Sequence, residues 1–366
     1  MLGLTLLALC QVTPTDASAH RETQPDPPAL FRESEDAAER GLAWLAEQQS
    51  ERGYWQADVG HKRMDGYVLL RSAEFNERIH EGHIGVSAIA GIAFLAGGHL
   101  PNRGTYGKNV QRCLDYVCAH TEDSGMITDG GTRMYSHAFA TLFLAEIYGM
   151  SGDEKTRLQL ERAVHLIVDC QNVQGGWRYN AFTPEADVSV TVCQVQALRA
   201  ARNIGVEVPK STIDAAVAFI KRARTPHGHN QGLFYYKNEG RSARTKNTEY
   251  AINAAAATAL FAAGVHEEKL FAPVLDFLED GYGQVHDYYA DHYYYWYGNY
   301  YACQAFFQAG GVRYERFQDR ICRDLIRSQR GDGRWVNSTG PGDAFSTAVA
   351  CIVLQIRRQF LPIFQR

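Results

Sequence analysis

The sequence predicts an all-α protein, an (α/α)6 toroid in which six helical hairpins close into a ring. A short turn of glutamine, glycine and an aromatic residue recurs with a period of about 50 residues. Each copy separates an amphipathic run from an apolar one, and no stretch shows convincing β alternation. An open array of helix pairs is the alternative, but a count of six pairs favours the ring.

The repeated turns are the clearest local signal. Residues 48–55 read QQSERGYW, residues 171–177 read QNVQGGW and residues 329–335 read QRGDGRW. Weaker copies occur at 124–126 and at 231–234. In each, a glutamine ends an amphipathic run, glycine makes the turn, and an apolar residue re-enters the core.

The runs on either side of these turns supply the two layers. The charged, amphipathic runs form an outer layer, and they cover 35–49, 106–121, 156–171, 210–224, 267–280 and 313–329. The apolar runs form an inner barrel, and they are His83–Gly97, Ser136–Met150, Asp187–Asn203, Thr248–Gly264, Trp296–Gly310 and Asp343–Arg358.

Three segments lie outside this repeat. Residues 1–19 resemble a secretory signal, with an apolar run followed by Ala17-Ser18-Ala19, so we expect an exported protein; a disordered terminus is the alternative. Residues 20–34 are expected to be a linker, and 35–366 the toroid. An insertion over 56–82 is either a functional loop or a surface flap, and it carries His61, Asp65, Glu74, His80 and Glu81.

Composition narrows the classes of protein. A net charge of −4 with 21% charged residues and no block of like charges argues against nucleic-acid binding. No other stretch approaches the ~20 apolar residues of a membrane span. Seven cysteines follow the leader, without a C-x-x-C pair, so buried free thiols are expected and one or two disulfides are the alternative.

Aromatic residues concentrate at the start of the fifth inner run and in the residues that lead into it. Residues 287–301 read DYYADHYYYWYGNYY. Helical spacing places Tyr293, Tyr297, Tyr300 and Tyr301 on one face, which we expect to point into a central cavity. Such rings suit an isoprenoid chain, a carbocation or a stacked sugar. The alternative is that they wedge inner helices against outer helices.

These turns, with QNVQGGWRYN, YYACQAFFQAGG and TAVACIVLQIRRQFLPIFQR, resemble the terpenoid cyclase and protein prenyltransferase repeat family. The resemblance covers almost the whole chain after the leader and implies the toroid fold. The chain is similar to exported bacterial proteins described as squalene-cyclase-like. Activity does not follow, because one fold hosts many chemistries.

The family's catalytic motifs are absent. The positions that hold zinc in prenyltransferases read Tyr297, Asn299 and, on the last inner helix, about Ser346, so we expect no metal and no cofactor. The Asp-x-Asp-Asp acid motif of the cyclases is matched by Asp187-Val188-Ser189-Val190. Ser189 stands where the proton-donating aspartate is expected, so protonation-initiated cyclisation is doubtful.

The remaining candidates lie where the inner helices begin. Asp187, Glu249 and Asp343 are candidate catalytic carboxylates, and plain N-caps are the alternative for Asp187 and Asp343. Glu249 and Asn253 are expected on a face of small residues. The candidate cavity residues are His83, His137, Thr191, Tyr250, Asn253, Tyr293, Tyr297, Asn299, Tyr300 and Ser346.

Three functions stay open at this point. The first is binding of a hydrophobic, isoprenoid-like small molecule in the aromatic cavity, with or without catalysis. The second is a non-catalytic binding or scaffold toroid. The third is a carbohydrate-active enzyme, for which Asp187 with Glu249 or Asp343 would supply the paired carboxylates.

Overall fold

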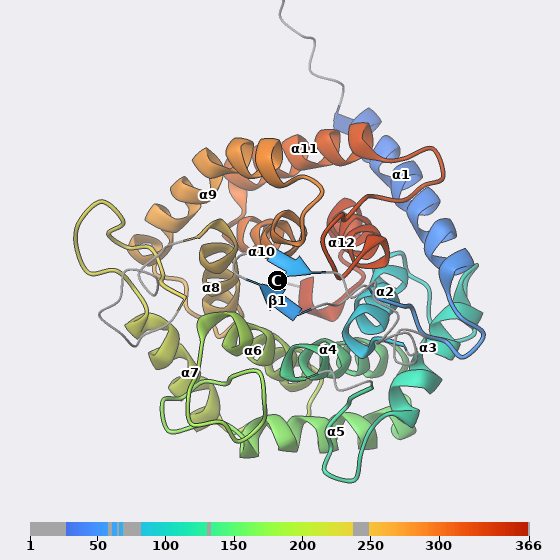
Figure 1. Cartoon of the computed structure of the whole chain (residues 1–366), viewed down its shortest axis with the longest axis horizontal. Coiled ribbons are helices and arrows are strands. Elements are labelled where there is room, and N and C mark those ends of the chain that lie inside the picture. The colour runs from blue at the N-terminus through green and yellow to red at the C-terminus, as the bar shows by residue number, and fades with distance from the viewer. Residues whose placement is uncertain are drawn as a thin grey trace, which may run out of the picture.

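The computed structural model describes residues 27–57, 61–63, 66–68, 82–129, 133–236 and 249–364. Over these ranges the chain forms twelve α-helices, arranged as an outer and an inner ring (Figure 1). The outer helices are α1 (Pro27–Gln48), α3 (Gly107–Ala119), α5 (Glu154–Asp169), α7 (Lys210–Arg222), α9 (Glu268–Tyr289) and α11 (Gly311–Ser328). The inner helices are α2 (Ile84–Ala96), α4 (Met134–Ser151), α6 (Val188–Asn203), α8 (Tyr250–Ala262), α10 (Tyr293–Ala309) and α12 (Asp343–Gln355).

The ring is closed, as the sequence predicts. Each inner helix packs against the next, and α12 packs against both α10 and α2. Helix α1 lies against α12 and also contacts α11, so the first outer helix covers the last hairpin (Figure 1). An open array of helix pairs is therefore wrong.

The repeated glutamines tie each turn to the following outer helix. Gln49 Nε2 donates to the carbonyls of Gly53 and Asn109, at 3.0 Å each. Gln171 and Gln329 repeat the pattern, and Gln329 reaches Ala37 O on α1 at 2.8 Å. The third copy thus joins the last outer helix to the first, which makes this hydrogen bond part of ring closure.

A second repeated contact fixes the residue that re-enters the core. Its backbone N–H donates to a polar side chain about one turn into the next inner helix. The Trp55, Trp177 and Trp335 amides, for example, donate to Ser87, Thr191 and Thr347 at 3.0–3.1 Å. Because these amides are buried, an unmade bond would be costly. We call the five acceptors the anchor residues: Ser87, His137, Thr191, Asn253 and Thr347.

Three features differ clearly from the sequence-based boundaries. Helix α9 continues to Tyr289, beyond the expected end at 280. Helix α1 begins at Pro27, so residues 27–34, expected to be linker, are helical. Proline fits a first helical turn, and Leu30 and Ser34 are buried as part of the same apolar stripe. The insertion contains a short antiparallel hairpin of β1 (His61–Arg63) and β2 (Gly66–Val68). The leader over 1–19 lies outside the described residues.

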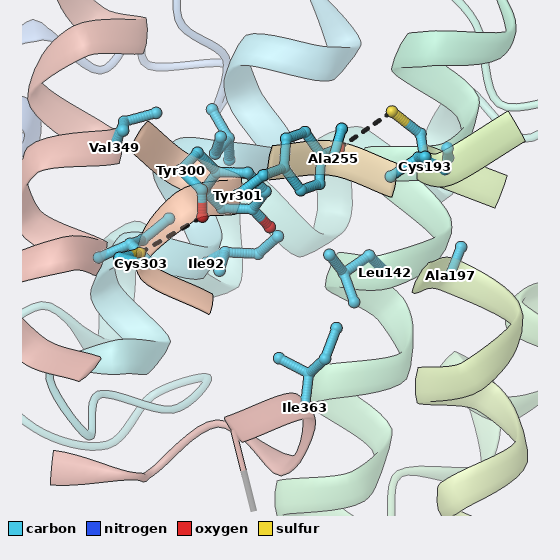
Figure 2. Close-up of a cluster of buried hydrophobic side chains, with 14 of the residues drawn as sticks. Ile92, Leu142, Cys193, Ala197, Ala255, Tyr300, Tyr301, Cys303, Val349 and Ile363 are labelled. Carbon is cyan, nitrogen blue, oxygen red and sulfur yellow. Dashed lines mark hydrogen bonds between the residues drawn. The ribbon is translucent and has the colours of Figure 1, made fainter. Parts of the chain in front are cut away.

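Apolar side chains fill the middle of the ring. Figure 2 shows Ile92, Leu142, Ala197, Val349 and Tyr301 converging from different inner helices. Ile363, in the 3-10 turn η4 (Pro362–Phe364), reaches the same cluster from one end (Figure 2). The seven cysteines of the described ranges are free thiols and six are buried, as expected. No helix among the described residues is long and apolar enough to cross a membrane.

Candidate functional site

Aromatic rings meet across the axis near the start of the inner helices. Tyr135 of α4 contacts Tyr297 of α10, with ring centroids 6.4 Å apart, and Phe139 contacts Tyr300 at 5.9 Å. Tyr300 and Tyr301 are 2% and 0% exposed. The rings that the sequence places around a hollow therefore fill it, because helices on opposite sides of the ring come close enough for their side chains to touch. Tyr135, Phe139 and Tyr297 are half-buried beside these rings, at the end of the barrel where the inner helices begin, which we call the mouth.

Helix α8 carries only small side chains along one segment, which helps the side chains of other inner helices to fill the centre of the ring. Its Ala254–Ala257 segment is fully buried and carries no side chain beyond Cβ. Side chains of its two neighbours, α6 and α10, consequently reach each other past it. Cys193 Sγ lies 3.1 Å from Tyr301 Oη, and Gln196 Nε2 donates to Gln304 Oε1 at 2.8 Å.

Asp187 lies fully buried beside this mouth, as the N-cap of α6. Its Oδ1 accepts from Val190 N at 2.8 Å and from Ser189 Oγ at 2.7 Å. Its Oδ2 accepts from Arg178 Nη1 at 2.5 Å, which makes a charge-assisted contact. Tyr135 Oη donates in turn to Ser189 Oγ. The carboxylate thus caps α6, forms an ion pair with Arg178, and is linked through Ser189 to the Tyr135 ring.

Two further tyrosines approach Asp187 from the loops. Tyr179 Oη and Tyr236 Oη are 2.5 Å apart, and the Arg178 guanidinium stacks over the Tyr179 ring at 4.5 Å. Burial, followed by the charge of Asp187, raises the pKa of both Tyr179 and Tyr236. These phenols therefore stay protonated, and one donates to the other in the hydrogen bond that joins them. We call Tyr135, Phe139, Tyr179, Tyr236 and Tyr297 the mouth aromatics.

Four predicted cavity residues instead hold turns in place. His137, Thr191 and Asn253 are anchor residues, fully buried, and their side chains accept from the amides of Ile127, Trp177 and Phe234. Ser346 Oγ donates to Trp335 O at 2.7 Å. These residues lie near inner-helix N-termini, but their side chains face the incoming turn and not the axis.

Tyr250 and Asn299 also pair with each other away from the mouth. Tyr250 Oη donates to Asn299 Oδ1 at 2.9 Å, and Asn299 Nδ2 donates to Tyr295 O. Both side chains are buried where α8 meets α10. Burial raises the pKa of Tyr250. This pair therefore joins two neighbouring inner helices.

The other candidates lie around the rim. Glu249 is exposed, with Tyr294 Oη donating to it at 3.2 Å, so the expected placement among small residues is not found. Glu249 is the N-cap of α8, so it lies just before the part of the helix that packs in the barrel. His83 caps α2 by accepting from Val86 N, and burial lowers its pKa to about 4. Tyr293 is half-buried against His292.

Asp343 lies at a cavity of about 540 Å3. This cavity is away from the mouth aromatics, between α1 with the first repeated turn and α12 with the last. The Asp343 carboxylate accepts from Asn337 N at 2.8 Å and pairs with Arg334 Nε at 3.1 Å. The structure brings together none of the three candidate carboxylates Asp187, Glu249 and Asp343 by any described contact.

Sequence reasoning missed Tyr135, Arg178, Tyr179 and Tyr236. Arg178 and Tyr179 directly follow Trp177 of the second strong turn, so their proximity to the start of α6 could have been inferred from the turn itself. Tyr135 has the same helical offset from the N-cap of α4 as Ser189 has in α6. Tyr236 offered no signal, because its place depends on how a loop folds over the barrel.

No protein-family model and no curated protein sequence matches the chain. Solved structures do match its fold. An α-1,6-mannanase, GH76A of Salegentibacter sp. HEL1_6, bound to α-1,6-mannotriose, is 9% identical with a TM-score of 0.63. The match covers 89% of this chain and 99% of the mannanase.

Two more solved structures extend the comparison. The type II terpene cyclase MstE from Scytonema, bound to geranylgeranyl dihydroxybenzoate, is 13% identical with a TM-score of 0.60, over 91% of this chain and 100% of the cyclase. A protein from Actinoplanes is 16% identical with a TM-score of 0.56, over 89% and 99%. The chain therefore has a terpenoid-cyclase-like toroid fold, which the GH76 enzyme shares.

Proposed function

We propose that this toroid binds a hydrophobic, isoprenoid-like small molecule on the mouth aromatics, without acid-initiated cyclisation. The observation that carries the proposal is the set of half-buried rings from α4, α10 and two loops, gathered where the inner helices begin. Aromatic faces attract apolar chains, and their burial by a ligand would be favourable at roughly 25 cal/mol per Å2. The terpene cyclase of this fold is bound to a geranylgeranyl compound.

The contacts of Asp187 support binding over proton donation. Every described partner of its carboxyl oxygens is a donor: Arg178, Ser189 and the Val190 amide. An acid that protonates an alkene must itself carry the proton and present it to the substrate. Ser189, in the middle of the matched motif, donates to Asp187 and accepts from Tyr135, so it acts as a link between carboxylate and ring.

Glycoside hydrolysis is less well supported. It requires two carboxyl groups that flank one bond, roughly 5–10 Å apart. Asp343 is the single carboxylate among the described residues that line the 540 Å3 cavity, and Asp187 is buried elsewhere. A non-catalytic toroid remains the second candidate, because both family motifs are replaced by residues engaged in structural hydrogen bonds.

The test is binding of geranylgeraniol and squalene, delivered from cyclodextrin and followed by intrinsic fluorescence and native mass spectrometry. We expect saturable binding by the wild type without turnover. Tyr297→Ala should weaken it about tenfold or more, because the ring at the centre of the mouth is lost. Tyr297→Phe should retain most of the affinity.

Tyr288→Ala is the matched control, since Tyr288 belongs to the same tyrosine-rich stretch but is 74% exposed at the end of α9. It should bind as the wild type does. Absence of binding by the wild type, or equal losses in Tyr288→Ala and Tyr297→Ala, would reject the site. Release of a cyclised product would reject the non-acid mechanism.

We also propose that the protein is exported, on the basis of the leader-like residues 1–19. Expression with a C-terminal tag and N-terminal sequencing of the exported fraction tests this directly. A mature chain that begins near residue 20 supports export. A chain retained in the cytoplasm with its N-terminus intact contradicts it.

A further inference from the structure

The toroid has a second feature suited to a ligand, at the seam where the ring closes. The seam pocket, of about 540 Å3, has one wall from α1 and a second from the turn that precedes α12. Figure 1 shows α1 lying alongside α12. Its volume falls within the roughly 300–1,000 Å3 of small-molecule sites. The side chains that define its chemistry are Trp44, Gln48, Gln56, Asn337, Ser338 and Asp343.

We propose that the seam pocket binds a neutral saccharide, separately from the mouth aromatics. The proposal does not depend on the hydrophobic ligand proposed above. It stands on three properties of the pocket: a partly exposed aromatic ring, a set of amide and hydroxyl groups, and the absence of cationic side chains among the described residues that line it.

The aromatic face is the indole of Trp44. It is half-buried, whereas the other rings of the lining, Tyr54 and Trp55, are 9% and 1% exposed and already packed. Gln48 follows one helical turn later on α1, so ring and amide share one face of the helix. A flat ring beside a planar amide matches a sugar, whose C–H face stacks while its hydroxyls take hydrogen bonds.

The polar groups favour a neutral ligand. Gln48 and Gln56 are exposed, and their amides make no hydrogen bond within the described parts of the chain. No lysine, arginine or histidine is among the described residues that line the pocket, which disfavours phosphates and carboxylates. The one carboxylate, Asp343, is neutralised by Arg334, so it is suited to accept from a hydroxyl and less suited to attract an amine.

The walls of the pocket are fixed in advance by the repeat. Trp55 Nε1 donates to Leu45 O, and Trp335 Nε1 donates to Leu325 O, each at 2.8 Å. Asn337 is held by its own backbone contact with Asp343. Rigid walls lower the ordering cost of binding. A ligand here would touch the first and last repeats together and so raise the melting temperature.

The test uses the full-length protein and four neutral trisaccharides: maltotriose, cellotriose, xylotriose and mannotriose. We expect at least one to bind in calorimetry with a Kd below about 10 mM and to raise Tm at saturating concentration. Trp44→Ala should weaken binding about tenfold. Gln48→Ala, an exposed change that leaves the core intact, should weaken it about threefold.

Tyr297→Ala serves as the control, because it alters the mouth aromatics and leaves the seam unchanged. It should bind the trisaccharide with wild-type affinity, and Trp44→Ala should still bind geranylgeraniol if the wild type does. The proposal is overturned if none of the four sugars binds the wild type, or if Trp44→Ala and Gln48→Ala both bind as tightly as it does.

Discussion

The anchor residues show how one side chain can determine the position of a whole turn. Thr191 Oγ1 accepts from the Trp177 amide at 3.1 Å, and both groups are buried. Thr191→Val keeps the shape but leaves that N–H without its acceptor. We expect a loss of about 1–3 kcal/mol in the free energy of unfolding, measured with denaturant.

Thr191→Ser is the control for this anchor, since it retains the hydroxyl and removes one methyl group. It should lose less stability than Thr191→Val. If the two variants were equally stable, the hydrogen bond would not be what holds the turn.

A buried carboxyl gives the fold a pH dependence. Glu146 of α4 is 0% exposed, and burial raises its pKa from 4.5 to about 8. Its Oε1 accepts from Ile363 N at 3.2 Å. Between pH 4.5 and 8 the folded chain holds a proton that the unfolded chain has lost, so the contribution of Glu146 to stability decreases as pH rises through that range.

Glu146→Gln removes this titration while keeping a neutral acceptor for Ile363 N. We expect its unfolding free energy to depend less on pH between 5 and 8.5, and to exceed that of the wild type at the upper end. Chemical denaturation across this range measures both slopes. Parallel slopes for the two proteins would show that Glu146 does not carry the effect.

At the residue scale, the sequence located the candidate site only in part. It placed Asp187 and Tyr297 near the starts of inner helices, since helix starts and helical faces follow from local pattern, but it did not show that Tyr300 is buried in the filled centre. It could not tell that His137 and Asn253 turn toward a backbone amide, because either direction is compatible with a polar residue on an inner helix. The partners that decide are distant in sequence and depend on packing.

At the element scale, the glycine turns determine how closely each outer helix approaches its neighbour. Gly175 has a φ of +87°, and a Cβ there would lie 2.4 Å from Ala215 O on α7. Gly205 has a similar φ of +91°, with nothing within 4 Å of the same position. Comparing these two glycines separates the cost of the left-handed backbone conformation from the cost of the close approach between helices.

Gly175→Ala should therefore cost clearly more than Gly205→Ala. The second variant incurs only the left-handed backbone penalty, about 1–2 kcal/mol, whereas the first must also displace α7. Thermal or denaturant unfolding of both variants gives the comparison. Equal losses would mean that the turn tolerates a wider separation of the helices.

All twelve helices were predictable because their amphipathic and apolar runs are separated by strong turn signals. The start of α1 was not, since Pro27 and Pro28 read as linker residues, although proline also suits a first helical turn. The β1–β2 hairpin was missed because three-residue strands carry too little alternation to be recognised.

At the scale of the whole molecule, closure makes the first and last repeats neighbours. Gln329 Nε2 donates to Ala37 O and to Gly333 O, both at 2.8 Å, as Gln171 Nε2 donates to Thr212 O and Gly175 O. The same two hydrogen bonds therefore act within the ring at Gln171 and across its closure at Gln329. An open array would lack the contact between Gln329 and Ala37.

We expect Gln329→Ala and Gln171→Ala to lower the unfolding free energy by similar amounts, about 1–3 kcal/mol each. In a closed ring with one cooperative core, weakening the seam should also reduce amide protection in α6 and α8, on the far side of the ring from α1 (Figure 1). Native-state hydrogen exchange of both variants measures this spread. If Gln329→Ala instead affected only α1, α11 and α12, the repeats would unfold as neighbours in a chain, and closure would contribute contacts without contributing cooperativity.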